Sequence, residues 1–267
     1  MSSKIINVPM NENIINAVCG HISGRQSAGA DFGKTAVISG GKRPFLFIKK
    51  ELALRSGKTF YSPHFFSNDD FIERIMFENS DFSKISDLEA AYILFETVES
   101  EAPVLLKNSK TFESFLQWAY EILFFIEQTD FEKVTEDKLN NLSANAQIGY
   151  DVPDNINELL KNIFKIRKKF HETLESSLQT TKGYSFLKCS EMPADILCGQ
   201  FDEIVLTAPF YLHKTELEIY KKIFDGGKLT VFAQGDPLRF ETLKKIYDYF
   251  NYPLPETKDP ENKFTLN

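Results

Sequence analysis

The chain has 267 residues, of which 42% are hydrophobic and 13% aromatic, a composition typical of a globular protein and unlike that of a disordered or fibrous one. Its formal net charge is -7. A domain that binds nucleic acid over much of its surface usually carries a basic surplus, so any contact with nucleic acid must be local in this chain.

Residues 1–80 alternate short β-branched segments with amphipathic helical patterns, which is typical of a parallel sheet with crossover helices. The expected strands are residues 4–8, 35–39 and 60–66. The expected helices are residues 12–22, 44–56 and 68–78, with Pro44 in the first turn of the second and Ser67 as the N-cap of the third.

Residues 81–200 show helical periodicity and almost no strand signal. Ser86 and Glu89 form a capping box that begins one helix, and a second helix surrounds Trp118. A third, long helix is expected from Pro153 to a stop at Gly183. This region is therefore predicted to be a helical insertion.

Strand and helix patterns alternate again after residue 200. The expected strands are 203–208 and 228–233, and the expected helices are 215–224 and 237–250. The sequence thus predicts an α/β fold whose parallel sheet is split by an all-α insertion. The predicted parts are residues 1–80 as the first part of the α/β core, 81–200 as the insertion, 201–250 as the second part of the core and 251–267 as a polar tail or linker.

Cysteine content and apolar patterning bear on the compartment. Cys19, Cys189 and Cys198 are an odd number without a CxxC pair, which argues against a disulfide framework or a zinc site and indicates a reducing compartment. The N-terminus has no charged segment followed by a long apolar one, and the longest apolar stretch, residues 115–126, is too short for a membrane span. The sequence predicts a cytoplasmic protein without membrane association.

Gly33-Lys34-Thr35 superficially resembles the end of a phosphate-binding loop, GxxxxGK[ST]. The motif requires glycine at position 28, which is Ala28 here, and it should leave a strand and open a helix, whereas this segment precedes a strand. The loop in the expected place, residues 9–13, contains no Gly, Lys, Ser or Thr. We therefore expect neither ATP binding nor ATP hydrolysis, and no cofactor in this chain.

Catalytic and metal-binding patterns are also weak. Pro153-Asp154 begins a helix, and the Glu-x-Lys matches at 256–258 and 261–263 lie in the polar tail, not on the neighbouring strands that a metal-dependent nuclease needs. The four histidines are scattered and form no i, i+4 pair. The sequence therefore predicts no catalytic residue and no metal ligand.

Basic residues gather after the second expected strand. Lys42, Arg43, Lys49 and Lys50 follow that strand, and the first two could meet a phosphate at a helix N-terminus. A solvated helix face is an equal alternative, because charged runs are often only surface. A second basic run, residues 165–169, is predicted to be solvated surface.

The order of elements resembles the first motor domain of superfamily 1 helicases. VISGGKRPFLFIKKELALRSG followed by FYSPHFFSNDDFIERI resembles the start of AddB-type subunits of the AddAB helicase-nuclease, and FESFLQWAYEILFFIEQTDFEKV and GYSFLKCSEM resemble later segments of that family. FDEIVLTAPFYLHKTELEIYKKIFDGG resembles the strand in the Walker B position and its following helix. In VFAQGDPLRF, Gly235 and Asp236 match a helicase Gly-Asp-x-x-Gln motif, but Arg239 replaces the Gln.

This resemblance implies a P-loop-NTPase-like core, similar to helicase domain 1A, with a helical insertion similar to domain 1B. It implies the ATPase-inactive N-terminal region of a protein of double-strand break repair and homologous recombination. Its implied partners are DNA, as a single-stranded tail or duplex end, and an AddA-like helicase subunit. Full-length relatives carry a C-terminal RecB-like exonuclease domain, which this sequence does not contain.

Two other hypotheses stay open. The chain could be a non-enzymatic scaffold whose aromatic-rich helical insertion docks a protein partner. It could also be a divergent P-loop NTPase that uses Gly33 to Thr35, in which case that segment would wrap an anion at a helix start.

Overall fold

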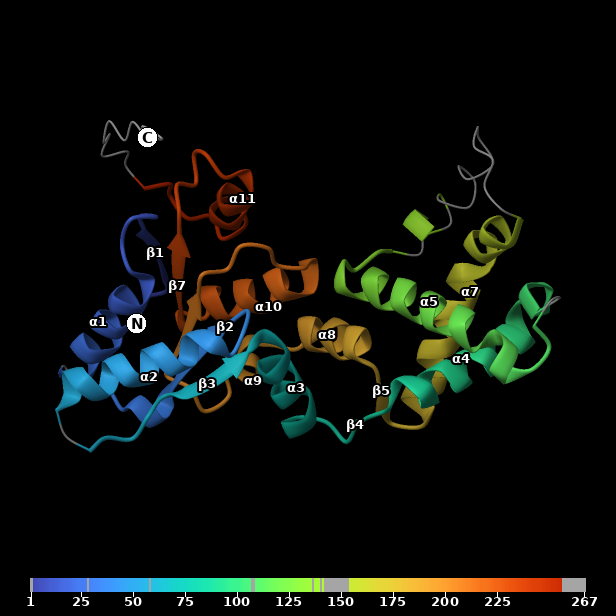
Figure 1. Ribbon diagram of the computed structural model, residues 1–267, viewed down its shortest axis with the longest axis horizontal. Helices are drawn as coiled ribbons and strands as arrows, with labels where there is room; N and C mark the ends of the chain where they lie inside the picture. Colours follow the sequence, from blue (N-terminus) through green and yellow to red (C-terminus); the bar gives the residue numbers. More distant parts are fainter. Residues whose placement is uncertain are drawn as a thin grey trace, which may run out of the picture. The chain divides into compact units, whose positions relative to one another are not determined.

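A computed structural model describes residues 2–27, 29–57, 59–106, 109–135, 137–139, 141 and 154–255 (Figure 1). The chain divides into two compact units. The α/β unit combines Met1–Ser67, Gln200–Tyr211 and Phe224–Asn267, and the helical unit combines Asn68–Gly199 and Leu212–Ile223. In the part of the chain that is described, no helix has both the length and the apolar character that a membrane span requires.

The α/β unit is built on a five-stranded, fully parallel sheet. Its strands, in spatial order, are β1 (Lys4–Val8), β7 (Leu229–Gln234), β6 (Glu203–Thr207), β2 (Thr35–Ser39) and β3 (His64–Ser67). β2 is paired at its end with both neighbours, Ser39 lying opposite Thr207 and Ser67. The predicted α/β class with a parallel sheet is confirmed.

Helices cover both faces of this sheet. α1 (Ile14–Ser27) and α2 (Arg43–Ser56) pack together on one face, where the buried residues of the helices meet those of the strands. This core consists of Val8, Val18, Cys19, Ile22, Phe32, Val37, Ile48, Leu52, Val205 and Phe232. On the opposite face, α11 (Glu241–Tyr249) contacts β1 through the Tyr247 hydroxyl, which donates to Asn7 Oδ1 at 3.2 Å. Each buried Val, Leu, Ile or Phe side chain of the core under α1 and α2 contributes about 1.5–3 kcal/mol to the free energy of folding.

The helical unit contains most of the remaining elements. They are α3 (Asn68–Glu78), β4 (Ser83–Lys84), α4 (Asp87–Glu101), α5 (Phe112–Phe131), α7 (Asp154–Ser176), β5 (Gln179–Thr180), α8 (Lys182–Glu191), α9 (Ala194–Cys198) and α10 (Lys214–Asp225). The predicted capping box is confirmed, because Ser86 and Glu89 bond reciprocally at the start of α4. Thr111 and Ser114 form a second one at the start of α5.

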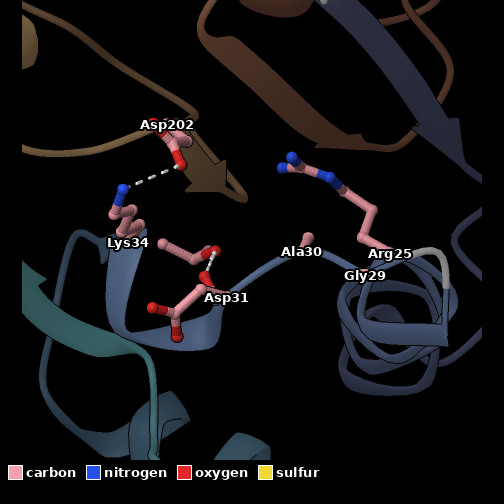
Figure 2. Close-up of a pocket in the computed structure, with 7 residues that line it drawn as sticks. Arg25, Gly29, Ala30, Asp31, Lys34 and Asp202 are labelled. Carbon is pink, nitrogen blue, oxygen red and sulfur yellow. Dashed lines mark hydrogen bonds and ion pairs between the residues drawn. The ribbon is translucent and has the colours of Figure 1, made fainter.

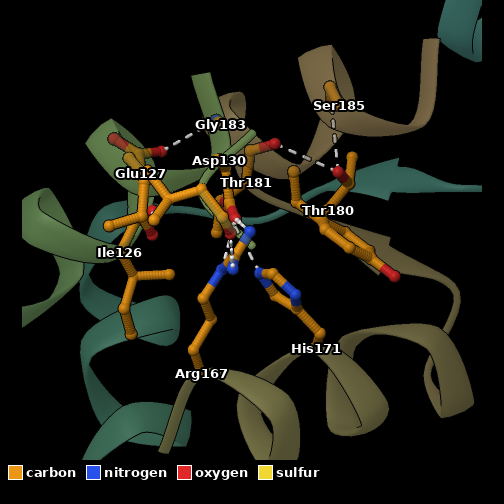
Figure 3. A network of polar contacts seen from close by, with 12 residues as sticks. Ile126, Glu127, Asp130, Arg167, His171, Thr180, Thr181, Gly183 and Ser185 are labelled. Atoms are coloured by element: carbon orange, nitrogen blue, oxygen red, sulfur yellow. Dashed lines mark hydrogen bonds and ion pairs between the residues drawn. The ribbon is translucent and has the colours of Figure 1, made fainter. Parts of the chain in front are cut away.

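A buried ion pair lies in the core of the helical unit (Figure 3). Asp130 of α5 is fully buried, and Arg167 and His171 of α7 point towards it. Arg167 Nη2 lies 2.7 Å from Asp130 Oδ1, and His171 Nε2 lies 3.0 Å from Oδ2. Arg167 also donates to the carbonyl of Val134 at 2.8 Å. The prediction that residue 167 belongs to a solvated basic run is therefore wrong, whereas Lys165 is exposed.

The division into units differs from the predicted boundaries at α3 and α10. Both were expected in the α/β core, as parts of residues 1–80 and 201–250, but both belong to the helical unit. Asn68 at the start of α3 bonds to Glu216 and Tyr220 of α10, at 2.9 Å each. The Cys189 thiol of α8 donates to the Ile72 carbonyl of α3 at 3.6 Å. These contacts, not sequence order, assign the two helices.

Several predicted boundaries also shift. The long helix ends at Ser176, because Leu178 has a φ of 52° and is followed by β5, which pairs with β4. Gly183 therefore lies inside α8 and does not stop α7. β3 begins at His64 rather than at residue 60, and residues 237–240 form a turn before α11.

Candidate nucleic-acid interface

The carboxyl edge of the parallel sheet carries four loops side by side. Because β1, β7, β6 and β2 are consecutive in the sheet, the segments that follow them lie in the same order along one edge. Backbone bonds fix two of them, since Gly235 N donates to Val8 O and Ala208 N donates to Phe232 O, each at 2.9 Å. In open α/β sheets, ligands usually bind at this edge.

The loop after β2 presents cations at the N-terminus of α2. Lys42 is the N-cap residue, its side chain makes no capping hydrogen bond, and the first turn has no acidic residue. Lys42 and Arg43 are both exposed. A cation at this end interacts unfavourably with the helix dipole, and this costs about 0.3–1 kcal/mol of helix stability at an exposed site. A phosphate bound here would accept hydrogen bonds from the helix N–H groups and neutralise the cations.

Lys49 and Lys50 lie about 10 Å further along α2, from the 1.5 Å rise per residue. Lys50 is exposed and shares a face with Arg43, seven residues earlier. The Lys49 ammonium lies 4.9 Å from the centroid of the Phe65 ring of β3. The structure thus brings Arg43 and Lys50 onto one helix face, whereas Lys49 contacts an aromatic ring.

Large apolar side chains are exposed on the other loops of the carboxyl edge. After β6, Phe210 and Tyr211 are 61% and 60% exposed. Exposed aromatic rings next to cations are the combination with which proteins stack nucleic-acid bases and hold the backbone. We call this set the carboxyl-edge surface, and its residues are Met10, Lys42, Arg43, Phe210, Tyr211, Leu238 and Phe240.

The degenerate helicase motif lies on the loop after β7. Gly235 has a φ of +127°, which favours glycine, and a Cβ there would lie 2.9 Å from the terminal Cδ1 of Leu243, whose side chain would have to shift. Asp236 Oδ1 accepts from Leu238 N at 2.9 Å, and its carboxylate lies 3.7 Å from Arg239 Nε. The motif residues therefore stabilise their own turn, with the Asp236–Arg239 pair in solvent.

In the loop after β1, the Asn13 side chain occupies the backbone N–H groups at the start of α1. Asn13 Oδ1 accepts from the backbone N–H groups of Ile15 at 2.9 Å and Asn16 at 3.4 Å, at the N-terminus of α1. These are the donors that a phosphate would use in a P-loop protein. The loop is joined to its neighbour by a hydrogen bond from Gln234 Nε2 to the Glu12 carbonyl at 3.1 Å.

The Gly-Lys-Thr segment lies at the opposite, amino edge of the sheet (Figure 2). Gly33 and Lys34 belong to a 3-10 turn, and Thr35 begins β2, so the segment leads into a strand as expected from the sequence. Gly33 N donates to Asp31 Oδ1 at 2.8 Å and Lys34 N to the Asp31 carbonyl at 3.1 Å. Lys34 lies 4.0 Å from Asp202 across a cleft of about 460 Å³. The segment does not begin a helix.

A buried carboxylate joins three elements at the same amino edge. Glu203 of β6 contacts His21 Nε2 at 2.8 Å, Thr230 Oγ1 at 2.6 Å and the Arg25 guanidinium. Burial by itself would raise the pKa of Glu203, but the hydrogen bonds from His21, Thr230 and Arg25 outweigh it and hold that pKa below its ordinary value. Because its partners come from α1 and β7, this cluster stabilises the α/β unit.

Comparison of the chain with models of known protein families gives no match, and neither does comparison with curated protein sequences. Within the described residues, no group of three His, Cys, Asp or Glu side chains is arranged to hold a metal ion.

Sequence reasoning found the cations of the carboxyl-edge surface but not its aromatic residues. Phe210 and Tyr211 lie three and four residues after the end of β6, in a loop where polar residues are usual, and Leu238 and Phe240 are apolar residues in the turn after β7. These apolar residues in loops are the sequence feature that could have predicted the exposed apolar part of the carboxyl-edge surface. Their alignment along one edge depends on β7 and β6 being neighbours in space.

Proposed function

We propose that this chain is a helicase-like, ATPase-inactive nucleic-acid-binding region, related to the AddB-type proteins that it resembles, and that it binds single-stranded DNA at the carboxyl-edge surface. In this proposal its core corresponds to a helicase domain 1A and the helical unit to a domain 1B insertion. The observation that carries it is the pair of exposed cations at the N-terminus of α2, which has neither a capping side chain nor an acidic first turn.

The neighbouring aromatic residues favour single strands. Phe210 and Tyr211 follow β6, which is paired with β2, so their loop adjoins the loop that bears Lys42. Bases can stack on exposed rings only when they are unpaired, and each such stack contributes about 1–3 kcal/mol. A duplex would offer the surface its phosphates alone.

The state of the two possible phosphate loops supports binding without ATP hydrolysis. Asn13 Oδ1 accepts hydrogen bonds from the N–H groups at the start of α1. The side chain and the carbonyl of Asp31 accept hydrogen bonds from the N–H groups of Gly33 and Lys34. Neither segment leaves these donors to a nucleotide. In the AddB-type proteins that the sequence resembles, a partner motor subunit drives movement, and we assign the same arrangement to this chain, with break repair as its process.

The test is binding of a fluorescent single-stranded oligonucleotide by the chain and by the double variant K42A/R43A. Loss of two phosphate contacts should weaken binding at low salt and reduce the slope of log affinity against log salt by roughly 1.4, from about 0.7 per phosphate on single strands. The matched control is K165A/K168A on α7, which removes the same charge from exposed positions of the helical unit.

Equal weakening by the two double variants would contradict the assignment, because it would show only long-range attraction. A third variant, F210A/Y211A, should weaken single-strand binding while leaving the salt slope unchanged, since stacking releases no counterions. Titration with a labelled ATP analogue should show no saturable binding at micromolar concentration. Saturable binding would refute the inactive-motor part of the proposal alone.

A further inference from the structure

Two neighbouring helices of the helical unit carry only negative charge. α4 and α5 pack against each other, and neither contains Lys or Arg. Their acidic residues are Asp87, Glu89, Glu96, Glu99, Glu101, Glu113, Glu121, Glu127 and Asp130. Exposed helices usually mix both signs, because i, i+4 pairs of opposite charge stabilise them. This pair of helices has none.

Aromatic side chains are exposed among these carboxylates. Tyr92 on α4 is 48% exposed, and Tyr120 and Phe124 on α5 are 39% and 61% exposed. We define the acidic aromatic face by six exposed residues, which are Tyr92, Glu96, Glu99, Tyr120, Glu121 and Phe124. On α4 they stand three or four residues apart, and on α5 Phe124 stands four residues after Tyr120 and three after Glu121, so each set lies on one side of its helix.

α4 and α5 pack against each other, and Tyr92 lies beside the first residue of α5, eight residues before Tyr120. The Tyr92 ring meets the Phe112 ring of α5 edge-on, with centroids 5.2 Å apart. A hydrogen bond with Glu96 raises the pKa of Tyr92, so these two side chains of α4 are in contact. The opposite sides of both helices are buried in the core, with Leu94 and Ile122 inaccessible.

The adjacent cations of α7 are engaged within their own helix. α7 packs against α4 and carries several exposed lysines. Lys161 lies 2.8 Å from Glu158, and Lys169 lies 3.9 Å from Glu172. The charge of the acidic aromatic face is therefore not balanced by those two lysines.

The chemistry of the face selects one kind of occupant. A nucleic acid would be repelled by the carboxylates, and a purely apolar partner would bury them without compensation. A helix with Lys or Arg beside apolar side chains satisfies both features, because cations pair with Glu96, Glu99 and Glu121 and also favour aromatic ring faces. We propose that the acidic aromatic face docks a basic amphipathic helix of a partner protein.

This inference names a surface and a partner chemistry that the proposed function leaves open, and it does not require nucleic-acid binding. A rival occupant exists on the chain itself, since α2 is basic and exposes Leu46, Phe47 and Leu54. A second copy joined through α2 would form a head-to-tail assembly, either a closed ring or an open filament. The test therefore includes the oligomeric state.

The probe is a synthetic peptide of about 18 residues, with Leu at helical spacing on one face and Lys on the other, and the full chain is titrated with it by fluorescence anisotropy. We expect saturable binding, and none of the matched peptide in which Glu replaces every Lys. E96Q/E99Q/E121Q should bind about fivefold or more weakly, and Y120A/F124A about tenfold more weakly, because anchors at the centre of an interface dominate affinity.

The matched control is E12Q/E241Q/D248N, which removes the same charge from exposed positions of the α/β unit. It should bind the peptide within about twofold of the unchanged chain. The proposal would be overturned if the control variant bound the peptide as weakly as E96Q/E99Q/E121Q does, or if Y120A/F124A bound it with the affinity of the unchanged chain. Concentration-dependent self-association in sedimentation velocity that E96Q/E99Q/E121Q abolishes would also overturn it. K42A/R43A should leave peptide binding intact, so failure of the nucleic-acid proposal remains distinguishable.

Discussion

The two units of this chain differ most in the charge of the surfaces that they expose. In the α/β unit, α2 carries Arg43, Lys49, Lys50 and Arg55 against a single acidic residue, whereas α4 and α5 of the helical unit carry only carboxylates. Both regions expose large apolar side chains. A net charge of -7 therefore hides two surfaces of opposite charge, so the net charge of the chain does not describe either surface.

The units also differ in the direction in which the pKa of their buried carboxylates is shifted. In the α/β unit, hydrogen bonds from His21, Thr230 and Arg25 outweigh burial and lower the pKa of Glu203. In the helical unit, burial raises the pKa of Glu127 and Glu216 despite their backbone hydrogen bonds. The balance between burial and hydrogen-bond donors sets the direction of the pKa shift of each of these carboxylates.

Buried thiols give a separate readout for each unit. Cys19 belongs to the α/β unit and Cys189 to the helical unit, and both are fully buried. Burial raises the pKa of Cys19 to about 11 and that of Cys189 to about 12. Because the thiolate is the reactive form, alkylation at neutral pH should report opening of the unit that contains each cysteine.

The largest effect is expected from Asp130→Ala in the helical unit. Removing this carboxylate leaves Arg167 buried without its partner, which should lower the free energy of unfolding by about 3–5 kcal/mol. Denaturant unfolding with mass spectrometry of alkylated peptides should show Cys189 reacting early while Cys19 stays protected. The control is Lys169→Ala, whose exposed pair with Glu172 is worth less than about 1 kcal/mol. Simultaneous exposure of both thiols would show that the units unfold together.

A smaller effect is expected from Gly183→Ala, which tests the packing of α8 on α5. The added Cβ would lie 2.8 Å from the backbone Cα of Glu127, so the helices must move apart at a cost of about 1–3 kcal/mol. The matched control is Gly24→Ala on α1, where nothing lies within 4 Å of the new Cβ. That change should stabilise the α/β unit by about 0.5–1 kcal/mol, because alanine favours a helix. Calorimetry should resolve the opposite signs, and a stable Gly183→Ala chain would contradict the close contact.

The smallest effect, about 1.5 kcal/mol at neutral pH, is expected from Glu203→Gln. The pKa of Glu203 is lowered in the folded chain, so its stabilising contribution is present above its ordinary value of 4.5 and is lost as pH falls through the folded value. Urea unfolding followed by circular dichroism between pH 3 and pH 7 should therefore show a smaller loss of stability towards acid in the variant. Asp202→Asn, exposed beside it, should keep the full acid dependence. An unchanged profile in Glu203→Gln would show that other groups control it.

Local signals were enough for the strands and the cations of the candidate interface. β1 and β2 have the predicted bounds, and Pro44 and Gly57 bracket α2 because a proline suits the first turn and Gly57 adopts φ of 60°. The predicted long helix extends beyond the end of α7 at Ser176. The helical periodicity of the sequence does not indicate that Leu178 adopts a left-handed conformation. Such a break is fixed by the pairing of β5 with β4, which are far apart in sequence.

The sequence by itself determined an α/β class, a parallel sheet interrupted by helices, and the cationic start of α2, because periodicity, capping and turn residues act over a few positions. Only the tertiary structure decided that α3 and α10 join the helical unit, that Arg167 is buried against Asp130, and that Phe210 and Tyr211 line the same edge as Lys42. Each of these depends on which distant segments pack together. That choice is made by burial and by hydrogen bonds between elements, and no short stretch of sequence contains both partners.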